Sequence, residues 1–134
     1  MLFRSHVLII DQIGILADLY KWADWALIGG SFKGKVHSVM EALSQGCYTF
    51  VGPFHGNNRE ALEFKKNVFF ALNKKVNMVQ PILKTKELID FILASKNFEM
   101  LQDVKIKIRS EVALRSGASE KLCNEILEAK TNWN

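Results

Sequence analysis

The fold is decided by residues 25–57, which read WALIGGSFKGKVHSVMEALSQGCYTFVGPFHGN. Two short apolar runs, Trp25–Ile28 and Tyr48–Val51, are each followed by glycine, as is typical of strands buried on both faces of a parallel sheet. Between them, His37–Gln45 has helical character, and Gly46 is a residue that commonly ends a helix. This order predicts a β-α-β unit with a right-handed crossover.

The remaining patterns extend this unit into an alternating α/β chain. We expect a first strand at Val7–Ile10 and a fourth at Val76–Val79. Helices are expected in the other segments, at Gly14–Asp24, Asn57–Asn73, from Thr85, around Leu101–Val112 and after Gly117. We therefore predict a Rossmann-like, three-layer α/β/α domain with a short parallel sheet of about four strands. Doubly wound sheets usually have more strands, which suggests a piece of a larger protein.

Composition is that of an ordinary globular domain. The 134 residues are 49% hydrophobic and 24% charged, and 18 Lys and Arg against 14 Asp and Glu give a net charge of +4. We interpret the paired lysines as solvated helix faces, and we expect no nucleic-acid partner. No stretch reaches the roughly 20 apolar residues of a transmembrane helix. The chain itself is therefore expected to be soluble.

The apolar and sulfur-containing residues predict a core. We expect four aromatic side chains to face it, namely Trp22, Trp25, Phe50 and Phe64. The last helix should pack Leu122, Ile126 and Leu127 inward. Cys47 and Cys123 are expected to be buried, reduced thiols of a cytoplasmic protein, because they form no zinc or redox motif.

Ligands of open parallel sheets bind beyond the carboxyl ends of the strands, where loops and helix N-termini converge. The residues that follow the two central strands, or that begin the next helix, are therefore the predicted binding site. They are Gly29, Gly30, Ser31, His37, Ser38, Glu41, Gly52, Pro53 and Asn57. His55 lies in the same loop, and its role stays open.

Six short motifs occur in one order along the chain. They are Ile10-Asp11, Leu19-Tyr20 with Ala23-Asp24, Gly29-Gly30-Ser31-Phe32, His37-Ser38-Val39-Met40-Glu41, Gly52-Pro53 with Asn57 and Glu60, and Gly117-Ala118-Ser119-Glu120. In this order the chain resembles the C-terminal half of the bacterial 3-deoxy-D-manno-octulosonic acid (Kdo) transferases, which are two-domain GT-B glycosyltransferases. It departs from that family at Ser38, where an asparagine is usual, at Lys35-Val36, which replace a glycine pair, and at Asn58, which replaces an aromatic residue.

The resemblance implies a function. Such enzymes transfer Kdo from CMP-Kdo to a lipid A precursor during synthesis of the lipopolysaccharide core, and their C-terminal half holds the nucleotide sugar without a metal or cofactor. Glu41 would accept hydrogen bonds from the ribose hydroxyls, and the Gly29–Ser31 turn would present backbone N–H groups to the phosphate. His37 and Asn57 would line the same cleft. The catalytic base, the lipid acceptor groove and the attachment to the inner face of the inner membrane would belong to an N-terminal half, so no catalytic residue is expected in this chain.

Other interpretations remain open. Ser38-x-x-Glu41 and Asn57-x-x-Glu60 both match capping boxes, in which side chains and backbone satisfy a helix start. Lys33 and Lys35 are interpreted as solvated loop residues. The chain could also be a non-catalytic nucleotide-binding or interaction module, or part of a GT-B enzyme that uses a UDP-sugar.

Overall fold

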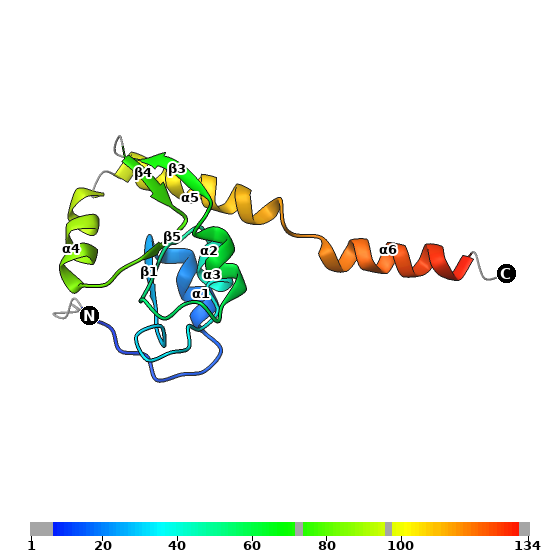
Figure 1. The fold of residues 1–134 in the computed structure, drawn as a ribbon, viewed down its shortest axis with the longest axis horizontal. Coiled ribbons are helices and arrows are strands. Elements are labelled where there is room, and N and C mark those ends of the chain that lie inside the picture. Colours follow the sequence, from blue (N-terminus) through cyan, green and yellow to red (C-terminus); the bar gives the residue numbers. More distant parts are fainter. Residues whose placement is uncertain (1–6, 72–73, 96–97, 132–134) are drawn as a thin grey trace, which may run out of the picture.

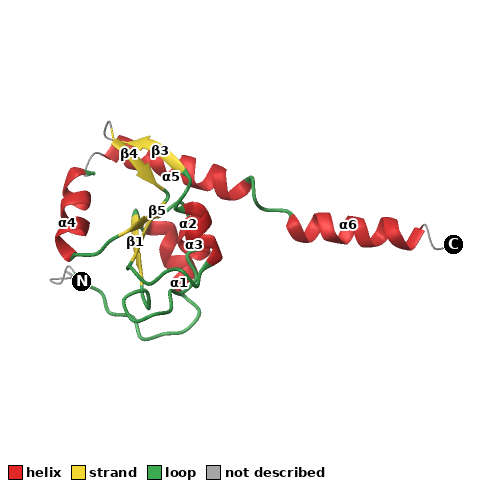
Figure 2. Ribbon diagram, viewed as in Figure 1, coloured by secondary structure: helices red, strands yellow, loops and turns green. Residues whose placement is uncertain are grey.

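The computed structural model describes residues 7–71, 74–95 and 98–131. Helices and strands alternate in the first half of the described chain, whereas the second half has consecutive strands followed by three consecutive helices (Figures 1 and 2). In order they are α1 (Leu16–Leu19), the 3-10 turn η1 (Tyr20–Trp22), β1 (Trp25–Ile28), α2 (Met40–Ser44), β2 (Tyr48–Val51), α3 (Arg59–Phe64), β3 (Val68–Ala71), β4 (Lys74–Asn77), β5 (Val79–Pro81), α4 (Thr85–Ala94), α5 (Phe98–Ala113) and α6 (Ala118–Thr131).

A three-stranded parallel sheet in the order β1-β2-β5 forms the centre of the body. Trp25 is paired with Tyr48, and Val51 is paired with Pro81. The middle strand, β2, is buried at all four positions, which agrees with its continuous apolar sequence. The predicted α/β fold with a short parallel sheet and the bounds of β1 and β2 are therefore confirmed, but among the described residues the parallel sheet has three strands where about four were predicted.

Aromatic rings from β2 and α4 pack together in the core. The ring of Phe91 stacks on Tyr48 with a centroid distance of 4.5 Å and meets Phe50 edge-on at 5.2 Å. Of the aromatic residues predicted to face the core, Phe50 and Phe64 are buried and Trp25 is half-buried. Trp22 is 88% exposed, so the prediction is wrong there, because the helix ends in a 3-10 turn that directs this residue outward.

The predicted first strand, Val7–Ile10, is not a strand. This segment is irregular, and its four side chains are between 39% and 88% exposed. An apolar run becomes a strand only where a neighbouring strand accepts its backbone hydrogen bonds, and within the described ranges β1 pairs only with β2. The following helix is also shorter than predicted, because α1 and η1 together cover only Leu16–Trp22.

The predicted helix Asn57–Asn73 is also partly wrong. It stops after Phe64, and β3 then pairs with β4 in an antiparallel ladder in which Val68 faces Asn77. Its predicted end at Asn73 lies outside the described residues. The predicted strand Val76–Val79 is divided between β4 and β5, since Met78 separates the hairpin from the parallel sheet. Apolar and aromatic residues suit either a buried helix or a strand, so periodicity alone did not separate the two.

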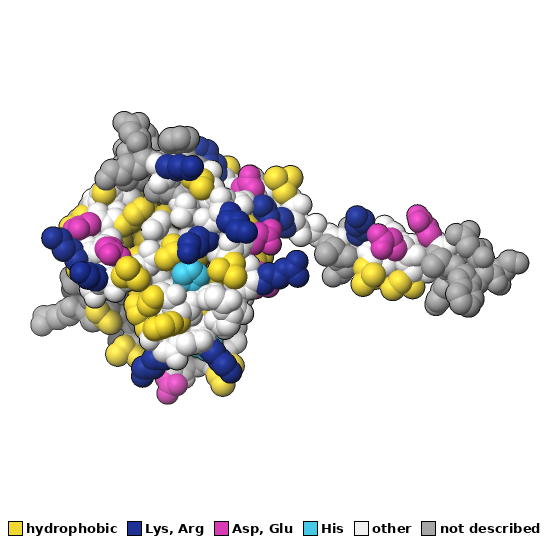
Figure 3. Space-filling view, viewed as in Figure 1, with side chains coloured by type: hydrophobic (Ala, Val, Ile, Leu, Met, Phe, Trp, Pro, Cys, Tyr) yellow, Lys and Arg dark blue, Asp and Glu magenta, His cyan; other side chains and the backbone are white. Residues whose placement is uncertain are grey.

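The last helix projects away from the body (Figure 1). Its apolar residues Leu122, Ile126 and Leu127 are about half exposed and do not pack inward as predicted. Cys123, on the same helix, is exposed, whereas Cys47 is buried. Hydrophobic side chains gather along one side of α6 in the space-filling view (Figure 3).

Candidate functional site

The loops that follow β1 and β2 are joined by one buried hydroxyl. Ser31 has no exposed surface, and its Oγ donates to the Ile28 carbonyl at 3.0 Å and accepts from the Gly52 N–H at 2.7 Å. The Phe54 N–H in turn donates to the Ser31 carbonyl at 2.9 Å. Because the hydroxyl is engaged on both sides, Ser31 fixes the two loops relative to one another and does not present its side chain to solvent.

Glycine is required where the first loop turns back on itself. Gly30 has φ +80°, and a Cβ there would lie 1.8 Å from the Lys35 carbonyl oxygen. The Lys35 N–H donates to the Gly30 carbonyl, and the His37 N–H donates to the Gly29 carbonyl at 3.3 Å. This return places the His37 imidazole over the glycine turn, where its Cδ2 would be 3.3 Å from a Cβ at Gly30.

Glu41 lies in the first turn of α2, and its carboxylate makes no hydrogen bond or ion pair with another described residue. Helix α2 begins at Met40, three residues later than predicted, and its cap residue Val39 makes no side-chain hydrogen bond. The alternative interpretation of Ser38 and Glu41 as a capping box is therefore wrong. Both residues are exposed, and within the described residues the Glu41 carboxylate has neither a hydrogen bond nor an ion pair. The carboxylate is free to meet a ligand.

Four of the predicted site residues meet in one pocket of about 560 Å³, namely Gly29, His37, Ser38 and Glu41. The rest of its lining consists of Leu16, Tyr20, Leu27 and Ile28. The sequence reasoning did not assign these apolar and aromatic residues to the site. The only signal for them was the Leu19-Tyr20 motif, which lies in the helix before β1.

The turn that carries Tyr20 is held to the body by two side chains. The Cys47 thiol donates to the Tyr20 carbonyl at 3.3 Å, and the Lys105 ammonium donates to the Ala23 carbonyl at 2.8 Å. Burial raises the pKa of Cys47 to about 11, so this thiol stays protonated and structural at neutral pH. Burial also raises the pKa of Tyr20, and the negative charge of nearby Glu41 adds to the effect.

The loop after β2 does not line the pocket but holds the loop after β1 in place. Gly52, Pro53 and Asn57 do not line the pocket, and the Gly52 N–H is already bonded to Ser31. The capping box considered for Asn57 is displaced by one residue, because it is Asn58 whose Oδ1 accepts from the Ala61 N–H at 2.7 Å. Asn58 also donates to the His37 carbonyl at 3.4 Å, which links α3 to the pocket wall.

His55, which the sequence left open, has a structural role. The side chain is buried, with Nδ1 2.8 Å from the Gly52 carbonyl and Nε2 3.3 Å from the Lys65 ammonium. The Gly52 carbonyl is an acceptor and the lysine ammonium is a donor, so both ring nitrogens have a partner inside the protein. His37 is thus the exposed histidine at the candidate site.

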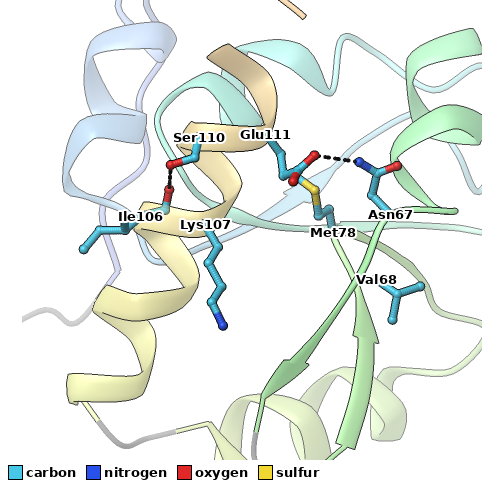
Figure 4. A pocket seen from close by; sticks show the side chains of 7 residues that line it. All are labelled: Asn67, Val68, Met78, Ile106, Lys107, Ser110 and Glu111. Atoms are coloured by element: carbon cyan, nitrogen blue, oxygen red, sulfur yellow. Dashed lines mark hydrogen bonds between the residues drawn. The ribbon is translucent and has the colours of Figure 1, made fainter. Parts of the chain in front are cut away.

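A second pocket of about 530 Å³ lies between the β3–β4 hairpin and α5 (Figure 4). Glu111 faces this pocket and is already bonded to Asn67 at 3.2 Å and to Arg115 at 3.0 Å. Met78, at the same pocket, directly precedes β5. The pocket therefore lies toward the amino ends of the parallel strands, away from the predicted site, and it contains none of the predicted residues.

The charged side chains do not form a single large patch on the face of the described residues seen in Figure 3. Lys and Arg side chains are spread over several parts of that face, with acidic side chains between some of them (Figure 3). Within the described ranges, no three His, Cys, Asp or Glu side chains are grouped closely enough to hold a metal ion. No helix of the described part is long and apolar enough to cross a bilayer.

Comparison with known proteins supports the resemblance found in the motifs. The protein named probable 3-deoxy-D-manno-octulosonic acid transferase, mitochondrial, of Arabidopsis thaliana is 29% identical over 94 residues, covering 69% of this chain and 20% of the plant protein. The 3-deoxy-D-manno-octulosonic acid transferase of Chlamydia pneumoniae is 25% identical over 111 residues, covering 80% of this chain and 24% of the relative. The Chlamydia muridarum enzyme of the same name is 41% identical over 54 residues, covering 39% of this chain and 13% of the relative.

No family model matches the chain, and no solved structure matches it significantly. The chain spans a quarter or less of the length of the relatives named above. The resemblance to the Kdo transferases is confirmed by these relatives.

Proposed function

We propose that this chain is the donor-binding part of a Kdo-type glycosyltransferase, with the fold of the C-terminal half of a GT-B enzyme. Its donor would be CMP-Kdo, and the whole protein would transfer Kdo to a lipid A precursor in lipopolysaccharide synthesis. The observation that carries the proposal is the single pocket formed by Gly29, His37, Ser38 and Glu41. Gly29, His37 and Glu41 belong to motifs in which the chain resembles the Kdo transferases, whereas Ser38 departs from the usual asparagine. The relatives in Arabidopsis thaliana and Chlamydia pneumoniae carry the name of the same enzyme.

In this proposal the pocket holds a nucleotide sugar without a metal. The exposed carboxylate of Glu41 accepts hydrogen bonds from the two ribose hydroxyls, because each carboxylate oxygen offers lone pairs to a donor. The glycine turn brings backbone N–H groups close to the phosphate. Ser31 and Asn58 act indirectly, since they hold the loops that carry Gly29 and His37.

The reaction itself would require the rest of the protein. An acceptor hydroxyl would attack the anomeric carbon of Kdo while the bond to the CMP phosphate breaks, and a base would take the hydroxyl proton. We place that base, the acceptor groove and the contact with the inner membrane in the part of the relatives that this chain does not cover. The purified chain should therefore show no transfer from CMP-Kdo, and robust turnover by it alone would contradict this division of roles.

Nucleotide titrations of the full chain test the proposal. Calorimetry or NMR should detect binding of CMP in the presence of a chelator, and Glu41→Gln should weaken it about tenfold or more, because a hydrogen bond to a charged group contributes about 1.5–3 kcal/mol. Glu125→Gln, an exposed substitution on α6, is the matched control and should leave the affinity unchanged.

Two results would favour a different function. Tighter binding of UMP than of CMP would indicate an enzyme that uses a UDP-sugar. A folded chain that ignores both nucleotides at millimolar concentration would indicate a non-catalytic module with another partner.

A further inference from the structure

The candidate pocket has a second kind of lining that the predicted donor contacts do not use. Leu16, Tyr20 and Leu27 line it together with the polar residues, and Leu16 and Leu27 are 52% and 51% exposed. Apolar side chains left half exposed inside a pocket are typical of sites that bind a ligand with an apolar face. The Glu41 carboxylate lies beside this apolar surface. The pair indicates a ligand that has an apolar group joined to a group rich in hydroxyls.

Tyr20 is fixed in place before any ligand arrives. Its ring packs against the buried core, and its carbonyl accepts from the Cys47 thiol at 3.3 Å. The same turn is held at Ala23 by Lys105 from α5. Among the described residues, no side chain forms a hydrogen bond with the Tyr20 hydroxyl. A rigid, half-buried ring loses little conformational freedom on binding, which favours its use as a contact surface.

We propose, on the basis of the proposed function, that Tyr20, with Leu16 and Leu27, receives the nucleobase of the donor while Glu41 holds the ribose of the same nucleotide. Base and ribose are joined by a single bond, so their binding surfaces must be adjacent, and Tyr20 and Glu41 line one pocket. The volume of about 560 Å³ lies within the range of ordinary small-ligand sites, about 300–1,000 Å³. Stacking on an aromatic ring accepts any base, so this wall supplies affinity for a nucleotide and does not select cytosine over uracil.

The test compares two probes that differ only in carrying a base. Full-length chains with Tyr20→Ala, Tyr20→Leu and Tyr20→Phe are titrated with CMP and with ribose 5-phosphate by NMR. Tyr20→Ala and Tyr20→Leu should weaken CMP about fivefold or more, in line with measured losses of base–aromatic stacking, and should leave ribose 5-phosphate unchanged. Tyr20→Phe should bind CMP within about twofold of the original chain, because it keeps the ring.

Trp22→Ala is the matched control. Trp22 lies in the same turn and is 88% exposed outside the pocket, so its loss should leave both affinities unchanged. The cytosine H5 and H6 resonances should move upfield on binding to the original chain and lose that shift in Tyr20→Leu, which keeps side-chain bulk without a ring.

The outcomes separate this inference from the function on which it rests. If CMP binds and Glu41→Gln weakens it, but folded Tyr20→Leu binds CMP normally, the base-binding role is wrong and the proposed function stands. An equal loss for CMP and ribose 5-phosphate would show that Tyr20 only shapes the pocket, and would also overturn the inference. If the original chain binds no nucleotide, both proposals fail.

Discussion

Replacing Ser31 by alanine should destabilise the chain, because the Gly52 N–H would lose its partner inside the protein. Ser31 is fully buried, and the bond to Gly52 is short, at 2.7 Å. An unsatisfied buried group costs about 1–3 kcal/mol, and we expect a loss of that size in the free energy of unfolding. Urea denaturation followed by circular dichroism measures it.

Ser44→Ala is the control for this substitution. Its hydroxyl also donates to a carbonyl, that of Glu41 at 2.8 Å, but Ser44 is exposed, so water can replace the bond and the change should stay within about 0.5 kcal/mol. Equal losses from the two serine variants would show that the Ser31 bridge does not stabilise the loops.

The buried thiol of Cys47 predicts a loss of stability in alkali. Its pKa rises from 9.0 to about 11 in the folded chain, so the folded state holds the proton more tightly than the unfolded state. The stabilisation is complete below about pH 9 and is lost as the pH rises toward about 11, with a magnitude of about 2–3 kcal/mol. Urea midpoints measured between these pH values should fall more steeply for the original chain than for Cys47→Ala.

Cys123→Ala should leave that pH slope unchanged, because Cys123 is exposed. Tyr20 and Tyr48 contribute with the same sign, since burial raises the pKa of both phenols. A slope that Cys47→Ala does not alter would assign the alkaline loss to the tyrosines alone.

Individual site residues were predictable to different degrees. Gly29, His37 and Glu41 could be found because they follow a buried strand or begin the next helix, and that placement depends on local sequence alone. The role of Ser31 could not be found, because its partner Gly52 is 21 residues away and the bond exists only once both loops are in place. Tyr20 was missed for a different reason: it precedes β1, and the rule that points to residues after each strand does not include it.

At the scale of single elements, a strand was predicted correctly where the sequence pattern also identified the strand that pairs with it. Trp25–Ile28 and Tyr48–Val51 have the predicted bounds, and each pairs with the other. Val7–Ile10 has a similar apolar composition and was also predicted to be a strand. No strand of the described sheet pairs with it, so this prediction was wrong. The predicted fourth strand stops at Val79, but β5 continues to Pro81, which is paired at the end of an edge strand where its missing N–H is tolerated.

The two adjacent asparagines before α3 should differ in their contribution to stability. Asn58 caps the helix through the Ala61 N–H, so Asn58→Ala should lower the free energy of unfolding by about 1 kcal/mol. Asn57 is exposed and makes no cap, so Asn57→Ala should change stability by less than about 0.5 kcal/mol. Thermal and urea unfolding of the two variants measure the difference. A larger loss for Asn57→Ala would place the cap at Asn57, as the sequence had suggested.

At the scale of the whole molecule, helical periodicity identified an apolar face on α6 but not its surroundings. Leu122 and Ile126 are four residues apart and therefore share a face, as predicted. Both are about half exposed, because α6 extends beyond the body and does not fold back on it (Figure 1). Periodicity reports which side of a helix is apolar, whereas the partner of that side depends on tertiary structure.

Removal of α6 should therefore leave the body intact. A chain that ends at Gly117 loses a helix whose described side chains at 121–128 are all exposed, so its free energy of unfolding should stay within about 0.5 kcal/mol of the original. Ile108→Ala on α5 is the contrasting variant, since that side chain is fully buried and its truncation should cost about 2–5 kcal/mol.

Urea unfolding at two protein concentrations measures both variants and also detects association through the exposed face of α6, because only an associating chain changes its midpoint with concentration. Small-angle X-ray scattering should show a smaller radius of gyration after the deletion, since α6 projects outward. A loss above about 1 kcal/mol on deletion, without any dependence on concentration, would mean that α6 packs on the body in solution and that its apolar face is covered by this chain.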